Sequence, residues 1–120
     1  MARRSPLMHT ITLANSGQVY NLYTLLQNRI NALALASNIP TFTLPHKCQS
    51  IQIQSDMNNG GANLYIGDPD SLSATEKGVG IVASQAFVIN SLESNLVILT
   101  DIGLLSDTPN SLINISLVTR

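Results

Sequence analysis

The sequence predicts a mainly β protein, a single-domain antiparallel β-sandwich of jelly-roll-like form with one helix near residues 19–37. Three observations support this fold class. Short segments alternate apolar and polar residues with a period of two, which is typical of half-buried strands. Turn-forming Gly, Pro, Asn and Asp residues separate these segments. Only one segment has helical periodicity, so the repeated strand–helix alternation of α/β proteins is not expected.

The length of 120 residues is that of one domain, and no change in composition marks a second one. We expect residues 1–7 to form a flexible N-terminal arm and residues 8–120 to form the sandwich domain. The first strand is expected at residues 8–14, where apolar and polar side chains alternate. The turn-forming run 15–17 ends it.

Residues 19–37 are the one helical candidate. Ser16 or Asn21 is expected to cap its start, because short polar side chains accept the first free N–H groups. Asn38 and Pro40 are expected to end it, because proline disfavours the helical region for the residue before it. We expect the helix to cover the core with a stripe of apolar residues at mostly three- and four-residue spacing: Leu22, Leu25, Leu26, Ile30 and Leu33.

The stretch 48–70 contains the clearest local pattern. Its first half alternates isoleucines with polar residues, and the run 58–61 supplies Asn and Gly residues that tolerate positive φ. A second short strand follows at residues 63–67. We therefore expect a β-hairpin whose apolar side chains pack together in the core: Ile51, Ile53, Leu64 and Ile66.

The rest of the chain alternates strands with loops. A short edge strand is expected at residues 41–44, between two prolines, because proline cannot donate to a central ladder. Residues 101–109 are expected to form a loop. The segment 96–99 is apolar throughout, as in a strand covered on both sides. Including it, the later strands are expected at residues 78–82, 85–90, 96–99 and 113–117.

The composition excludes several classes of function. Charged residues make up 11% of the chain, less than half of the ~25% that is usual for soluble domains. The six Lys and Arg residues are scattered and aromatic residues make up only 4%, so neither a basic stripe nor a stacking platform for nucleic acid exists. No apolar run is long enough for a membrane span or a signal peptide. We expect no nucleic-acid or membrane partner and synthesis in a cytosol.

The only cysteine and one of the two histidines lie close together in the sequence. His46 and Cys48 are two residues apart, on one face of an extended segment. A Cys–His catalytic pair needs a third orienting group, and a metal site needs more ligands; the neighbouring sequence supplies neither. No Gly-rich phosphate loop precedes a helix. We expect no enzyme activity and no cofactor.

The acidic residues Asp56, Asp68 and Asp70 are the only candidates for a metal or sugar site. Oxygen-rich loops can hold calcium, but the spacing differs from that of the helical calcium loop and Pro69 interrupts the run. A glycosidase pair of carboxylates would need a sugar platform, and the chain has no Trp. In the alternative interpretation, these Asp side chains accept backbone N–H bonds within turns.

One pattern in the second half of the chain points to a known family. It consists of a strand ending in a polar turn, a Tyr-Ile-Gly-Asp strand end and a serine-rich loop with glycine: residues 48–56, residues 63–68, Ser73, Gly78 and Gly80. With this pattern, over roughly residues 48–118, the chain resembles capsid decoration (cement) proteins of tailed bacteriophages. The resemblance implies an often oligomeric β-sandwich or jelly-roll subunit that binds the outer face of the major capsid protein shell without catalysis.

The resemblance implies two partners, the major capsid protein and further copies of the chain. We expect a homotrimer, because capsids offer threefold sites. The expected location is the capsid surface of a virion, after synthesis in the host cytoplasm. Two alternatives stay open: a tail or neck subunit of the same virion, and a carbohydrate- or calcium-binding β-sandwich that uses the Asp loops. The expected contact residues lie in the arm and at the hairpin tip: Arg3, Arg4, Ser5, Pro6, Leu7, Asn58 and Asn59.

Overall fold

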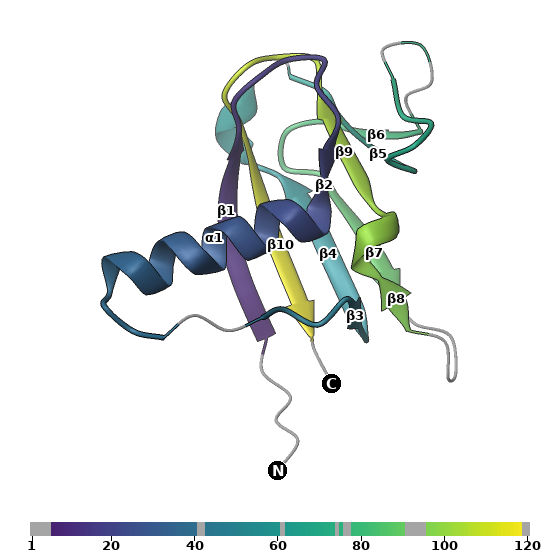
Figure 1. Cartoon of the computed structure of the whole chain (residues 1–120). Coiled ribbons are helices and arrows are strands. Elements are labelled where there is room, and N and C mark those ends of the chain that lie inside the picture. The colour runs from purple at the N-terminus through teal and green to yellow at the C-terminus, as the bar shows by residue number, and fades with distance from the viewer. Residues whose placement is uncertain are drawn as a thin grey trace.

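The computed structural model describes residues 6–40, 43–60, 62–73, 75, 78–90 and 96–118, except for the side chains of residues 6 and 7. Two four-stranded antiparallel sheets form a sandwich, and the helix lies across the strands (Figure 1). The elements, in chain order, are β1 (Pro6–Leu13), β2 (Tyr20–Asn21), α1 (Leu22–Ala36), β3 (Lys47–Cys48), β4 (Ser50–Ser55), η1 (Met57–Asn59), β5 (Leu64–Gly67), β6 (Val79–Ile81), β7 (Ala86–Asn90), β8 (Val97–Ile98), η2 (Leu99–Asp101), β9 (Gly103–Ser106) and β10 (Ser111–Val118).

The order of strands is that of a jelly roll. One sheet has the order β1-β10-β4-β7 and the other has the order β2-β9-β5-β6, while β3 and β8 form a separate short pair. The pairs β1/β10, β2/β9, β4/β7 and β5/β6 are nested, as in one long hairpin rolled into two sheets. All of these pairs are antiparallel. The predicted fold class, a mainly β sandwich of jelly-roll form with one helix, is therefore confirmed.

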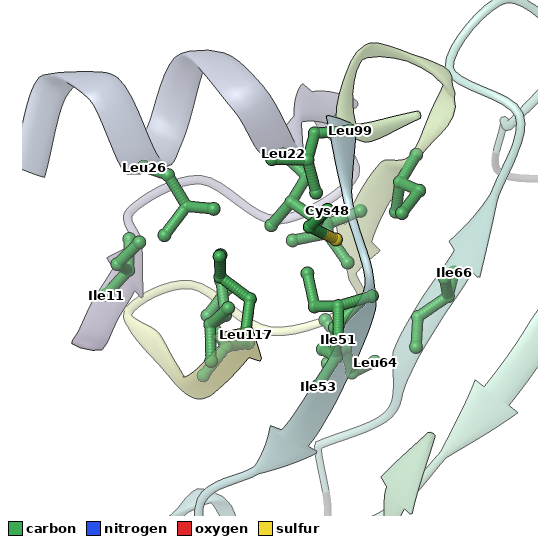
Figure 2. Packing of buried hydrophobic residues seen from close by; sticks show 14 of the residues in the cluster. Ile11, Leu22, Leu26, Cys48, Ile51, Ile53, Leu64, Ile66, Leu99 and Leu117 are labelled. Atoms are coloured by element: carbon green, nitrogen blue, oxygen red, sulfur yellow. The ribbon is translucent and has the colours of Figure 1, made fainter. Parts of the chain in front are cut away.

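The core lies between the two sheets and under the helix (Figure 2). Alternate residues of β4 and β10 are buried, because successive side chains of a strand point to opposite faces and only one face packs on the core. Leu22, Leu26 and Ile30 of α1 join this cluster, so the helix covers the core as predicted. Leu33, which we expected in the apolar stripe, is instead 39% exposed, and Ala34 takes the buried position.

Both ends of α1 are set by asparagine. The side chain of Asn21 accepts the backbone N–H groups of Tyr23 at 3.0 Å and Thr24 at 3.4 Å, so Asn21 is the cap and Ser16 is not. At the other end, Asn38 adopts a left-handed conformation with φ of 54°. This conformation reverses the chain and ends the helix at Ala36, close to the predicted boundary.

The predicted hairpin between residues 48 and 70 is wrong. β4 pairs with β10 and β7, whereas β5 pairs with β9 and β6, so the two strands belong to different sheets. The connection through η1 crosses from one layer of the sandwich to the other. A period of two specifies which face of a strand is buried, but it does not specify the neighbouring strand. The side chains expected in the core are all buried there: Ile51, Ile53, Leu64 and Ile66.

Residues 103–106 were expected to lie in a loop but form β9, in which every residue is buried. Leu104 lies in the core. The other face of β9 is covered by the turn after β5, because a Cβ atom added to Gly103 would lie 2.8 Å from Pro69 Cα. A strand covered on both faces shows no alternation, which is why the pattern missed it. The segment 96–99, where burial on both faces was expected, contributes only a two-residue strand with Ile98 40% exposed.

Two further boundaries differ from expectation. β1 begins at Pro6, so residues 6 and 7, assigned to the arm, pair with Val118 and Leu117. Of the expected edge strand 41–44, residues 41 and 42 lie outside the described residues, and the other two form no strand. Side chains of α1 take the place of a ladder there: Gln27 Oε1 accepts the Leu44 N–H at 2.7 Å, and the Tyr23 hydroxyl donates to the Leu44 carbonyl at 2.6 Å.

Candidate interaction surface

The outer face of the β1-β10-β4-β7 sheet points away from the core that the two sheets enclose. The register places its outward-pointing side chains in rows, for example Met8, Ser116, Gln52 and Val88 across the four strands. None of the residues of this outer face is charged. They are Met8, Thr10, Thr12, Ser50, Gln52, Gln54, Ala86, Val88, Asn90, Leu112, Asn114, Ser116 and Val118, and each is exposed or half-buried.

Hydrogen bonds hold two of the polar side chains of this face, Thr10 and Asn114. Thr10 Oγ1 donates to Asn114 Oδ1 at 2.8 Å, and Asn114 Nδ2 donates to Asp56 Oδ2 at 3.0 Å. A shallow hollow of about 290 Å³ lies over β1, β10 and β4, with Gln52 and Gln54 on one wall. Burial, followed by the positive charge of Arg29, lowers the pKa of His9 beneath it, so this imidazole is mostly neutral at pH 7.

Among the described residues, Asp56 is the carboxylate that hydrogen-bonds to the outer face, through Asn114. The backbone N–H of Asn58 and then the side-chain amide of Asn114 lower its pKa, because both donate to the ionised carboxylate. The ionised form is thus favoured in the fold. Its contribution to stability is present above the carboxyl pKa of the unfolded chain and is lost as the pH falls through the lower folded value.

The acidic residues do not come together into a binding site. Asp56 lies in the connection before β5, whereas Asp68 and Asp70 follow the other end of this strand. Asp56 accepts the Asn58 N–H and Asp68 accepts the Asp70 N–H, both at 2.9 Å, so these two carboxylates hold turns. Within the described ranges, no three His, Cys, Asp or Glu side chains lie close enough together to hold a metal ion.

The structure also separates His46 from Cys48. The His46 ring packs edge-on against the Tyr23 ring, with 4.5 Å between the ring centroids. The Cys48 side chain is fully buried in the core, and this burial raises its pKa to about 11. Cys48 is therefore a small apolar core residue.

The Cys48 thiol should resist modification while the protein is folded. The thiolate is the reactive species, and both burial and the raised pKa keep its population small at neutral pH. We expect iodoacetamide at pH 7.5 to label Cys48 only at the rate of unfolding, and to label it quickly in urea. Mass spectrometry over time measures this, with free cysteine as the control. Rapid stoichiometric labelling of the folded protein would contradict the buried position.

The expected contact residues lie in three different situations. Arg3, Arg4 and Ser5 lie outside the described residues, and Pro6 and Leu7 belong to the β1 backbone. Asn58 is exposed at η1. Asn59 uses its side chain within the chain: its amide donates to Ser55 Oγ at 2.9 Å and the Leu112 carbonyl at 2.7 Å, and it accepts the Leu112 N–H at 2.8 Å.

Replacing Asn59 by alanine should cost about 1 to 3 kcal/mol of unfolding free energy. The change removes all three hydrogen bonds and leaves partly buried groups at the start of β10 unpaired. Asn58→Ala removes the same carboxamide group from an exposed position. It is the matched control and should change stability by less than about 0.5 kcal/mol. Urea denaturation of both variants measures the difference, and equal stabilities would refute this role of Asn59.

The outer face is the candidate interaction surface that the sequence did not reveal. Its residues were assigned to separate strands, and only the register shows that they share one charge-free surface. The low fraction of charged residues, 11% of the chain, was the one sequence feature that pointed to such a surface. Among the described residues, no helix has the length and apolar character needed to cross a membrane.

Comparisons with known proteins add a structural likeness. A scan against protein-family models gives no match. A search of curated proteins gives no match either. Among solved structures, the chain is similar to one in the cryo-EM structure of a virus-like particle of the extra small virus of the giant freshwater prawn Macrobrachium rosenbergii. The two share 15% identity with a TM-score of 0.49, over 97% of this chain and 76% of the viral one.

Proposed function

We propose that the chain is a non-enzymatic structural subunit of a virion and acts by binding other protein subunits. The jelly-roll order of its strands carries this proposal, since capsid proteins are one of the main groups built on this fold. Lectin domains and cupins also use it. The chemistry of the surface favours the first group, because the described residues gather neither a metal-ligand cluster nor an aromatic sugar platform.

The finer proposal is that the subunit decorates the outside of a bacteriophage capsid by docking on the major capsid protein. It rests on the sequence resemblance to decoration proteins. The outer face fits such a contact, because the centres of protein–protein interfaces are depleted of charged residues. Its neutral amides and hydroxyls provide hydrogen-bonding groups without the cost of desolvating a charge.

Electron microscopy and sedimentation test the proposal. Copies bound to a particle should group in threes, because the proposed trimer is the one that threefold sites of a shell would hold. Added to particles of the encoding phage that lack it, the chain should cosediment and saturate at a fixed ratio. Closed shells formed by the chain alone would show that it builds the shell itself, and would refute decoration. Density on the tail or neck would also refute decoration, and would favour the tail or neck subunit.

Two variants locate the contact. Gln52→Lys places a charge in the middle of the outer face and should reduce particle occupancy at least about tenfold. Asn28→Lys adds the same charge to an exposed position of α1 and should leave occupancy unchanged. Deletion of residues 2–5 tests the proposed contact of Arg3 and Arg4 while leaving β1 intact. Unchanged occupancy in this deletion variant would exclude the arm as a contact.

Calorimetry with calcium and with a panel of glycans tests the alternative class. A binding module should give tight, saturable heats that are lost in Asp56→Asn or Asp68→Asn. The absence of such heats is the expected result, because Asp56 and Asp68 each accept a backbone N–H within a turn and lie at opposite ends of β5.

A further inference from the structure

The free edge of β7 is the strongest unassigned interaction feature of the fold. β7 lies at the end of its sheet and pairs only with β4 among the described strands. We propose that this edge pairs with the β7 edge of a second copy of the chain, antiparallel and centred on Val88. The sheet would then continue across a twofold axis. This inference stands apart from the proposed virion role and does not depend on it.

The hydrogen bonds next to β7 determine which backbone groups point outward. Gln85 accepts the N–H of Ser55 at 2.9 Å. In an antiparallel pair, successive residues point their N–H and C=O groups alternately toward the neighbour and away from it. Phe87 and Ile89 therefore bond to β4. The N–H and C=O groups of Ala86, Val88 and Asn90 point to the open side, where the described residues offer no partner.

The other edges of the two sheets are protected, whereas this one is not. β1 begins with a proline and packs against α1. β2 has two residues, and β6 has three and contains Gly80. β7 has five residues, AFVIN, with neither proline, glycine nor a charge, and Val88 is 52% exposed. Native proteins normally block such an edge with charge, proline or a covering element, because it can add a strand from another chain.

The outward-pointing backbone N–H and C=O groups of β7 can pair with the same groups of a second copy. When Val88 lies opposite the Val88 of a second copy, Ala86 lies opposite Asn90 and each residue exchanges both backbone bonds with its counterpart. On the inner side, Phe87 meets the Ile89 of the second copy, and both are half-buried in the single chain. Such aromatic–β-branched pairs stabilise sheets. On the outer side, two charge-free faces join without like charges meeting. These features favour a second copy over an unrelated strand.

Opposite charges at residue 88 give a specific test of the axis. Sedimentation velocity of the full chain over a range of concentrations should show a monomer–dimer equilibrium. Val88→Lys and Val88→Glu should each weaken dimerisation at least about tenfold, because like charges meet at the axis. An equimolar mixture of the two variants should regain the dimer. Val79→Lys is the matched control, a valine 46% exposed on the edge strand β6, and should dimerise as the wild type does.

Disulfide trapping provides the second measurement. Opposite hydrogen-bonded residues have Cα atoms about 5.5 Å apart, within the range that a disulfide spans. Val88→Cys should therefore form a covalent dimer under mild oxidation much faster than Val79→Cys, and the buried Cys48 does not compete. A wild type that stays monomeric at its highest soluble concentration would overturn the proposal. A mixture of Val88→Lys and Val88→Glu that stays monomeric would also overturn it. Equal cross-linking rates for Val88→Cys and Val79→Cys would overturn it as well.

Discussion

Leu104→Ala should lower the free energy of unfolding by about 3 to 5 kcal/mol, a large part of the stability of a small domain. Leu104 is fully buried and belongs to the core cluster between the two sheets. The change removes the transfer free energy of the lost methyl and methylene groups. It also leaves a cavity, because β9 is held between β2 and β5 and cannot collapse into it.

Leu35→Ala is the matched control for this substitution. Leu35 is 85% exposed on α1, and alanine is also the better helix former, so the variant should lie within about 0.5 kcal/mol of the wild type. Urea denaturation followed by circular dichroism measures both. If residues 101–109 formed a loop, as the sequence alone indicates, the two substitutions would have similar small effects. That result would refute the assignment of β9.

Gly78→Ala should cost roughly 2 to 5 kcal/mol through two separate effects. Gly78 has φ of 62°, a conformation that costs a residue with a side chain about 1 to 2 kcal/mol. In addition, the new Cβ atom would collide with the Ile66 carbonyl oxygen, which belongs to the neighbouring strand β5. Relieving this collision requires β5 and the chain entering β6 to move apart, and such overpacking typically costs a further 1 to 3 kcal/mol.

Gly17→Ala separates the two effects. Gly17 has φ of 72°, but an added Cβ atom would meet nothing within 4 Å. This variant should therefore show only the conformational cost of about 1 to 2 kcal/mol. Thermal and urea denaturation of both variants gives the comparison. Equal losses of unfolding free energy for Gly78→Ala and Gly17→Ala would show that β5 moves aside for the new methyl group at little cost. That result would contradict tight packing of Gly78 against β5.

The sequence predicted elements with one buried face well and elements with two buried faces poorly. β10 and β4 alternate clearly, so their inward-facing residues, Ile53 and Ile115 among them, were assignable from the pattern alone. β9 lacks this alternation because Pro69 and the turn around it cover its outer side. A local pattern therefore misses a strand when a distant loop supplies half of its environment.

Strand pairing and the interaction surface were beyond local patterns for a related reason. The jelly roll pairs residues far apart in the chain, such as Ile53 with Ile115, so neighbours in sequence are not neighbours in the sheet. By contrast, Asp56 and Asp68 each accept the backbone N–H of the residue two positions later, a local contact. The sequence therefore allowed these turns to be predicted as one of two interpretations. The charge-free outer face depends on the register of four strands and became visible only when that register was known.

The pairing of the first and last strands also determines the polarity of the molecule. Pro6 lies opposite Val118, so the chain enters and leaves the sandwich at the same end, as Figure 1 shows. In a layer whose copies all share one orientation, this end of every copy faces the same side, whereas in the antiparallel β7 pair the ends of the two copies point in opposite directions. A peptide fused to either terminus should be displayed on a single side of a one-orientation layer, and at both ends of the antiparallel pair. The protease accessibility of such fusions would report which side of an assembly the end occupies.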